Sequence, residues 1–170
     1  MEQLTHYNSS FEPRRFPITV ICDAVYFQQN IGSIFRICDA FGVSKILFTG
    51  EHFIFSERKI NKTSRNTHKT VPFEIIKDKE LLIERLKKDN FYLIAIEITD
   101  NSIPIENLQL KDKKATPLAL IIGNEISGIS KELLRISDQT AHINMYGQNS
   151  SMNVVQALSI GLFAITQAIK

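Results

Sequence analysis

The stretch HINMYGQNSSMNVVQALSIGLFAITQAIK, His142 to Lys170, decides the fold. Its apolar start, Ile143 to Met145, predicts a short strand. In the polar loop that follows, Ser150 or Ser151 is predicted to cap a long helix, because a hydroxyl oxygen accepts a hydrogen bond from a first-turn N–H. A buried face of this helix is predicted by apolar residues at the helical period: Val154, Leu158, Leu162, Ile165 and Ile169. Gly161, within that helix, indicates close packing against a neighbour.

The same alternation of strand and helix runs through the rest of the chain. Apolar runs predict five further strands, at 18–22, 43–49, 71–76, 91–98 and 118–122. Helices are predicted from an Asn30 cap to a Gly42 stop, from an Asp78 cap to Lys88, and from a Ser130 cap to Ile136. This order predicts one α/β domain over residues 1–170, a parallel sheet with helices on both faces. Residues 1–16 are expected to lie extended on its surface.

Composition excludes several classes of protein. The 170 residues carry a net charge of only +2, so the total charge argues weakly for nucleic acid. Cys22 and Cys38 lack a metal or redox spacing and are predicted to be reduced core residues. The four histidines are scattered, and no metal site is predicted. The absence of a leader or a membrane-length apolar run predicts a cytoplasmic protein. The fingerprints of dinucleotide-binding, P-loop and serine-hydrolase proteins are missing.

One segment, residues 55–70, is strongly basic. Against the single acid Glu57 it carries five cations: Arg58, Lys59, Lys62, Arg65 and Lys69. Hydroxyl and amide side chains lie between them, a mixture that suits contacts with phosphate and sugar. A solvated helix and loop explains the charges equally well, so a nucleic-acid surface and a plain solvent face are both open.

Polar motifs follow the predicted strands where parallel sheets bind ligands. They are NIGSIFR at 30–36, GNEISGIS at 123–130 and INMYGQNSSMNV at 143–154. Taken singly, each could be only a cap or a turn. Three such motifs in one small domain favour a common site.

Together the three motifs resemble those of the SpoU/TrmH branch of the SPOUT RNA ribose 2′-O-methyltransferases. The first motif, N-x-G-S/T-x-x-R, is matched by Asn30, Gly32, Ser33 and Arg36. The second, G-x-E-x-x-G-[IL], is matched by Gly123, Glu125, Gly128 and Ile129. The third is matched by Ile143, Met145, Gly147, Ser151, Met152, Asn153 and Val154. The basic segment also resembles one in the family, and the resemblance covers residues from Ile18 to the C-terminus.

The resemblance implies a deep C-terminal trefoil knot, a homodimer, and S-adenosylmethionine as cofactor. The residues it assigns to the cofactor are Ile96, Gly123, Ile143 and Ser151. Those it assigns to catalysis are Arg36, Asn30, Glu125, Ser151 and Asn153. Each site would be completed by the partner's first motif, so that the 30–41 helix and the C-terminal helix lie at the interface. A guanidinium is a poor base, so Arg36 is expected to bind phosphate and to stabilise charge on the 2′-oxygen.

Two departures from the family pattern limit these expectations. Asn144 stands where the family has proline, which should loosen the turn into the cofactor pocket because proline fixes φ. The chain also lacks the additional N-terminal RNA-binding domain of many ribosomal RNA enzymes, which favours tRNA as substrate. The alternatives are an rRNA methyltransferase, a non-catalytic RNA-binding member of the same fold, and a small-molecule methyltransferase.

Overall fold

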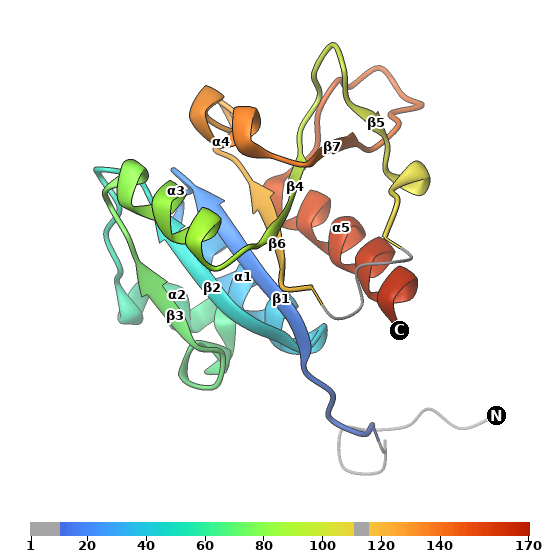
Figure 1. Ribbon diagram of the computed structural model, residues 1–170. Helices are drawn as coiled ribbons and strands as arrows, with labels where there is room; N and C mark the ends of the chain where they lie inside the picture. The colour runs from blue at the N-terminus through green and yellow to red at the C-terminus, as the bar shows by residue number, and fades with distance from the viewer. Residues whose placement is uncertain (1–10, 111–115) are drawn as a thin grey trace, which may run out of the picture.

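Seven parallel strands form one sheet in the computed structural model, which describes residues 11–110 and 116–170 (Figure 1). The sheet order is β3-β2-β1-β6-β4-β7-β5. The strands are β1 Phe16–Asp23, β2 Val43–Thr49, β3 Phe73–Ile75, β4 Tyr92–Ile96, β5 Ile103–Pro104, β6 Leu118–Ile122 and β7 Gln139–His142. The α-helices are α1 Gln28–Ala40, α2 Glu57–Ser64, α3 Lys79–Lys88, α4 Lys131–Ile136 and α5 Val154–Ile169. Two short 3₁₀ helices are η1 Thr67–Lys69 and η2 Ile105–Asn107.

Burial explains the order of the strands. All five residues of β6, at the centre of the sheet, are buried, which suits a strand covered on both faces. The short strands β3 and β5 form the two edges, and β5 contains Pro104. Proline cannot donate to a ladder and is tolerated at an edge. The predicted parallel α/β sheet and the predicted edge strand near residues 71–76 are therefore confirmed.

Helices cover both faces of the sheet. Buried residues of α1 and α5 join one apolar cluster, and those of α3 and α4 join a second cluster on the opposite face (Figure 1). The predicted stripe of α5 is buried along its whole length. A Cβ on Gly161 would lie 3.3 Å from Leu120 Cδ2 and 3.4 Å from Ile96 Cγ1, so this glycine brings α5 close to β6 and β4. Cys22 and Cys38 are free and buried in the core, as predicted.

The last strand lies four residues earlier than predicted. Gln139–His142 pairs with β4 and β5, whereas residues 143–147 form a loop. The apolar side chains of Ile143 and Met145 line a pocket instead of entering the ladder. Polar residues suit β7, because it lies next to a two-residue edge strand and is only partly covered.

Three of the predicted helix N-caps differ from those in the structure. Asn153, not Ser150 or Ser151, caps α5, and its side chain accepts a hydrogen bond from Val155 N at 2.8 Å. Asn30 lies inside the first turn of α1, where its side chain has partners from distant segments. Ser130 occupies the N-cap position of α4, but its hydroxyl makes no cap bond. Asp78 caps α3 as predicted, accepting from Glu80 N and Leu81 N.

The position of β7 bears on the predicted knot. The chain runs from β4 to the far edge at β5, returns to the centre at β6, and then inserts β7 between β4 and β5. A knot requires such a late insertion into a loop already laid down. Its closure also depends on residues 111–115, which lie outside the described residues, so the trefoil knot stays a prediction. Residues 1–10 of the predicted surface segment lie outside them too, while residues 11–15 are exposed and carry no helix or strand.

Candidate active site

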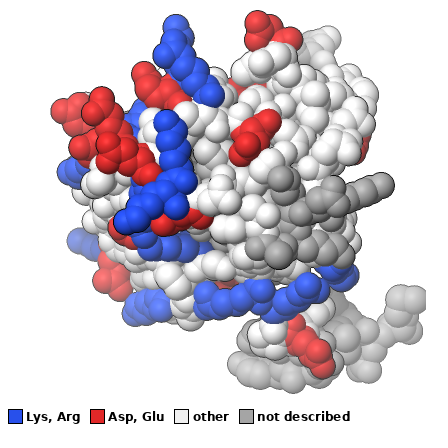
Figure 2. Space-filling view, viewed as in Figure 1, with Lys and Arg blue, Asp and Glu red and all other residues white. Residues whose placement is uncertain are grey.

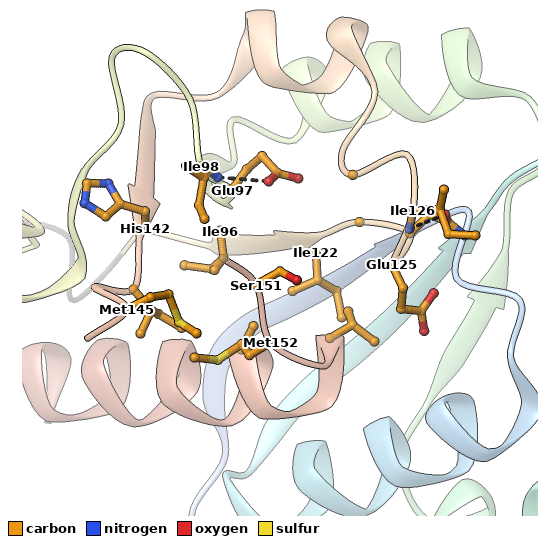
Figure 3. Close-up of a pocket in the computed structure, with 16 residues that line it drawn as sticks. Ile96, Glu97, Ile98, Ile122, Glu125, Ile126, His142, Met145, Ser151 and Met152 are labelled. Carbon is orange, nitrogen blue, oxygen red and sulfur yellow. Dashed lines mark hydrogen bonds between the residues drawn. The ribbon is translucent and has the colours of Figure 1, made fainter. Parts of the chain in front are cut away.

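A pocket of about 350 Å³ opens at the carboxyl ends of β4 and β6 and beneath the loop that follows β7 (Figure 3). Its lining includes all four residues predicted to hold the cofactor: Ile96, Gly123, Ile143 and Ser151. Met145 and Met152 add polarisable apolar surface. Figure 3 shows Glu125 at one end of the pocket and His142 at the other, with Ser151 between them. The structure thus brings three distant segments into one cavity.

The loop after β6 turns so tightly that it needs glycine. A Cβ on Gly123 would lie 2.3 Å from the carbonyl carbon of Gly128 and 2.4 Å from Ile129 N. Asn124 Oδ1 accepts hydrogen bonds from the N–H groups of Ile126 and Ser127, which fixes the turn. The close approach predicted at Gly123 is therefore to its own loop, and it leaves this loop's backbone facing the pocket.

Glu97 was not predicted as a site residue. Its Oε2 accepts a hydrogen bond from Ile129 N at 3.0 Å, and its Oε1 accepts one from Ile98 N at 2.9 Å. Gly128 adopts a φ of +67°, and a Cβ there would lie 2.5 Å from Glu97 Oε2. Glu97 thereby holds the glycine loop against the end of β4. An acid directly after a buried strand, at the ligand-binding edge, was the signal that could have indicated it.

Three predicted catalytic residues form one hydrogen-bonded chain. Asn153 Nδ2 donates to Asn30 Oδ1 at 3.3 Å, and Asn30 Nδ2 donates to Glu125 Oε1. The chain has a fixed direction, because Asn153 uses its own oxygen as the α5 cap. Each member comes from a different motif, and Asn30 is buried. Glu125 lines the pocket, so the chain presents an oriented carboxylate and two ordered amides beside the cavity. Such groups can hold a hydroxyl in place for reaction.

Arg36 is not part of this arrangement within the chain. It lies six residues after Asn30 on α1, which places it about 120° away around the helix axis. Its side chain is exposed, it does not line the pocket, and it makes no hydrogen bond or ion pair with the described residues. Of the five predicted catalytic residues, Arg36 alone neither lines the pocket nor joins the hydrogen-bonded chain.

The five predicted RNA-binding cations lie on one helix-turn unit. Arg58, Lys59 and Lys62 are on α2, Arg65 follows in the left-handed conformation, and Lys69 ends η1. All five are exposed. On the face shown in Figure 2, acidic and basic side chains mix around α3, and no uniformly basic surface appears there. Ile60 of α2 packs in the cluster of α1 and α5, so these cations lie on the side of the sheet opposite α3.

Gly32 of the first motif positions this basic unit. A Cβ on Gly32 would lie 2.1 Å from Thr63 Oγ1 and 2.5 Å from the carbonyl oxygen of Ile60, so only glycine lets α2 pack so closely on α1. Thr63 Oγ1 also donates to the carbonyl oxygen of Gln29 at 3.1 Å. The first motif therefore has two roles. Asn30 hydrogen-bonds to the pocket residue Glu125, and Gly32 allows the basic helix α2 to pack closely on α1.

Comparison with known proteins places the chain in a family. Residues 17–163 match the SpoU rRNA methylase family. The chain belongs to this family. It is 28% identical over 163 residues to the tRNA (guanosine(18)-2′-O)-methyltransferase of Aquifex aeolicus, covering 95% of this chain and 74% of that protein. It is 29% identical over 147 residues to the 23S rRNA (guanosine-2′-O-)-methyltransferase RlmB of Blochmanniella floridana, covering 86% of this chain and 56% of that protein.

The fold has a close counterpart among solved structures. The crystal structure of an AdoMet-bound rRNA methyltransferase from Sinorhizobium meliloti matches with a TM-score of 0.80 at 24% identity, over 92% of this chain and 58% of that one. The SpoU match confirms the family predicted from the three motifs and, with it, an RNA methyltransferase as the class of enzyme. No helix in the described part of this SpoU protein is long and apolar enough to cross a membrane.

In this SpoU protein, the turn at Asn144 is restrained by a hydrogen bond, whereas a looser turn was expected without proline. Its Nδ2 donates a hydrogen bond to Glu106 Oε1 at 3.1 Å, which ties the loop after β7 to η2. His142 Nδ1 is hydrogen-bonded to Ser102 Oγ at 2.9 Å in the same region. These two side-chain bonds restrain the loop that carries Ile143 and Met145, where a proline would have restrained the backbone directly.

Proposed function

We propose that this chain transfers the methyl group of S-adenosylmethionine to a ribose 2′-oxygen of tRNA. One observation carries the proposal: the Asn153–Asn30–Glu125 hydrogen-bonded chain ends beside the pocket lined by the predicted cofactor residues. The relatives named above act on tRNA or rRNA by their names, at identities near 30%. The match covers 74% of the tRNA relative and only 56% of the rRNA relative, which favours tRNA between the two.

The pocket fits the proposed cofactor in size and chemistry. Its volume of about 350 Å³ lies in the range of small-molecule sites, which are mostly apolar with a few polar groups. Ile96, Met145 and Met152 would contact the apolar parts of S-adenosylmethionine, and the backbone around Gly123 would form hydrogen bonds with its polar groups. When bound, the sulfonium supplies a methyl carbon with a good leaving group, so the protein has mainly to align the reactants.

The residues of the chain then have distinct tasks. Glu125, oriented by Asn30, accepts a hydrogen bond from the attacking 2′-hydroxyl and orients its oxygen. Ser151 lies between the carboxylate and the apolar end of the pocket and contacts the donor. The 2′-oxygen gains negative charge as this proton passes to the Glu125 carboxylate and from there to water. A guanidinium at the adjacent phosphate, which stays protonated, stabilises that charge.

That guanidinium would come from a second copy of the chain. Arg36 is exposed and does not line its own pocket, so in the proposed homodimer it would reach the pocket of the partner. The exposed side chains of Ile160 and Phe163 on α5 give this helix an apolar outer face that suits such an interface. The buried, unpaired thiols of Cys22 and Cys38 suit the cytoplasmic location that belongs to this proposal.

Methyl transfer from tritiated S-adenosylmethionine tests the proposal directly. Purified protein should label bulk tRNA and leave rRNA unlabelled, and alkaline hydrolysis should stop at the labelled ribose, because a 2′-O-methyl blocks cleavage. Calorimetry with S-adenosylhomocysteine should show binding of one molecule per chain. Cofactor binding without labelling of either RNA would point to a non-catalytic member of the fold. Labelling of rRNA alone would overturn the choice of tRNA, and labelling of a base would overturn the assigned oxygen.

A further inference from the structure

An exposed apolar ledge lies at the start of α1. Phe27, the residue before the helix, is 57% exposed, and Ile54, in the loop between β2 and α2, is 68% exposed. Tyr26 and His52 adjoin them, with ring centroids 6.4 Å apart. We call these four residues the aromatic ledge. Phe27, Ile54 and His52 are exposed, whereas Tyr26 is half-buried against the core, and such a group of exposed side chains suits an interaction surface.

The ledge is held rigidly by Gln28. Its Nε2 donates to the carbonyl oxygen of Ile54 at 2.8 Å and to that of Tyr26 at 3.3 Å, and its Oε1 accepts from Ser56 N at 3.2 Å. Phe53, between the exposed neighbours, is buried and stacks on Phe48 with centroids 4.7 Å apart. The loop is therefore anchored from inside, and its outward residues are fixed in place rather than free to fold inward.

The ledge lies next to the candidate catalytic groups. Phe27 is one turn before Asn30 on α1, and its carbonyl oxygen accepts the helical bond from Ile31 N at 3.0 Å. Asn124 Nδ2 donates to the carbonyl oxygen of Ala24 at 2.9 Å, which joins the segment before the ledge to the loop of Glu125. The segment that carries the ledge is therefore joined both to the helix of Asn30 and to the loop of Glu125.

Cations flank the other side of the ledge. The α2 helix begins directly after the loop of Ile54, and Arg58 and Lys59 are exposed in its first turn. Neither forms an ion pair with a described carboxylate, so both are available to an anion. Protein–protein interfaces deplete lysine, whereas recognition of single-stranded RNA combines aromatic stacking with cations on the phosphates. The charge beside the ledge therefore favours RNA over a second copy of the chain.

We propose that the aromatic ledge stacks an unpaired base that flanks the methylated ribose, while Arg58 and Lys59 contact its phosphates. The inference rests on the proposed function and adds a binding site for the RNA base next to the methylated ribose, which the cofactor pocket does not hold. A 2′-hydroxyl becomes accessible when its strand is splayed out, and the neighbouring base then needs a new stacking partner. Each such base contributes roughly 5- to 100-fold in affinity.

Substitutions at Phe27 test the ledge, because this side chain makes no cap bond for α1. Phe27→Leu keeps apolar bulk and removes the ring, and Phe27→Trp keeps a ring. Filter binding with bulk tRNA should show about a tenfold weaker Kd for Phe27→Leu and a Kd near that of the wild type for Phe27→Trp. The KM for RNA should rise in parallel, while kcat and S-adenosylhomocysteine affinity stay unchanged. Leu81→Ala, at an equally exposed site on α3, is the matched control and should change nothing.

Three results would overturn the ledge assignment. The first is equal tRNA affinity for Phe27→Leu and the wild type. The second is an equal loss of affinity in Phe27→Leu and Phe27→Trp, which would show that an aromatic ring is not what the site needs. The third is a change of mass in light scattering, which would make the ledge a contact between copies. A wild-type protein that binds and methylates RNA with no effect at Phe27 overturns the ledge alone. A wild-type protein that neither binds nor methylates any RNA overturns the proposed function together with it.

Discussion

Asn153 performs two tasks with one amide, and substitution can separate them. Its oxygen caps α5, and its nitrogen donates to Asn30. Asn153→Ser keeps a cap oxygen and loses the donor to Asn30, so it should fold within about 0.5 kcal/mol of the wild type and still lose most methyl transfer. Asn153→Ala should lose activity and also about 0.5–2 kcal/mol of stability. Urea unfolding and the tritium assay measure the two effects. Full activity in the Ser variant would remove the amide from the site.

Gly32 should not tolerate a methyl group. The carbonyl oxygen of Ile60, 2.5 Å from an added Cβ, belongs to the backbone and cannot rotate away, so α2 has to shift. Gly32→Ala should cost about 1–3 kcal/mol of unfolding free energy despite the better helix propensity of alanine. Gly147→Ala is the matched control, because nothing lies within 4 Å of its added Cβ. Equal urea midpoints for the two variants would contradict the close packing of α1 and α2.

At the residue scale, the sequence located most of the pocket and misassigned its caps. Strand-end position indicated that Gly123 lies near a ligand, because parallel strands deliver their carboxyl ends to one edge, whereas Ser151 was assigned to the pocket by the family resemblance. The role of Asn30 as a helix cap was wrong. Propensity at a helix start describes an isolated helix, and it cannot include Glu125, which arrives from 95 residues away. Glu97 was missed for the same reason, since its partner is the backbone of a distant loop.

At the scale of the element, the prediction is that the basic unit formed by α2 and η1 contacts RNA. If it contacts RNA phosphates, Lys62→Glu with Arg65→Glu should weaken tRNA binding and reduce the slope of log Kd against log salt, because fewer counterions are released. Charge reversal at Lys87 and Lys88, exposed at the end of α3, is the control and should leave the slope unchanged. The same slope in both double variants would place the RNA elsewhere.

Glu74 ties the edge strand β3 to two neighbours and makes that edge sensitive to acid. Hydrogen bonds from Lys45, at 2.5 Å, and from Arg85, at 2.7 Å, lower the pKa of its carboxyl. A lowered pKa stabilises the fold above the unfolded value near 4.5, and this contribution is lost as the pH falls through the folded value. Glu74→Gln should therefore cost at most about 1 kcal/mol at pH 7, since solvent screens the pair, and less at pH 4.

Urea titrations at both pH values check this expectation for β3. Glu84→Gln, an exposed change on α3, serves as the control. A cost for Glu74→Gln that stays constant or grows towards pH 4 would contradict the ion-pair account.

Elements with strong periodicity were predictable, and short ones were not. The α5 stripe and the buried runs of β1 and β6 follow directly from their apolar patterns. The strand Gln139–His142 was missed because its four residues, three of them with half-buried polar side chains, carry no apolar alternation. Its place is set by the gap between β4 and β5, which is a property of the sheet and not of the segment.

At the scale of the whole molecule, the pocket is complete except for a cation. The cofactor residues, the two amides and Glu125 meet within one chain, while Arg36 faces outward. The proposed symmetric dimer would resolve this, because an isologous contact would supply each pocket with the arginine of the partner. The dimer and the knot both involve relations that local sequence patterns do not encode, so the family resemblance alone predicts them.

Mixed dimers test the shared site most directly. Two differently tagged chains, Arg36→Ala and Glu125→Ala, are co-expressed and isolated through both tags. Each homodimer should be inactive, whereas the mixed dimer holds one intact site, the pocket of the Arg36→Ala chain served by the other chain's Arg36. It should show about half of wild-type methyl transfer. A dimer of wild type with the chain that carries both substitutions should be inactive. The opposite pattern, an inactive mixed dimer and a half-active control, would mean that Arg36 serves its own pocket and would contradict the account.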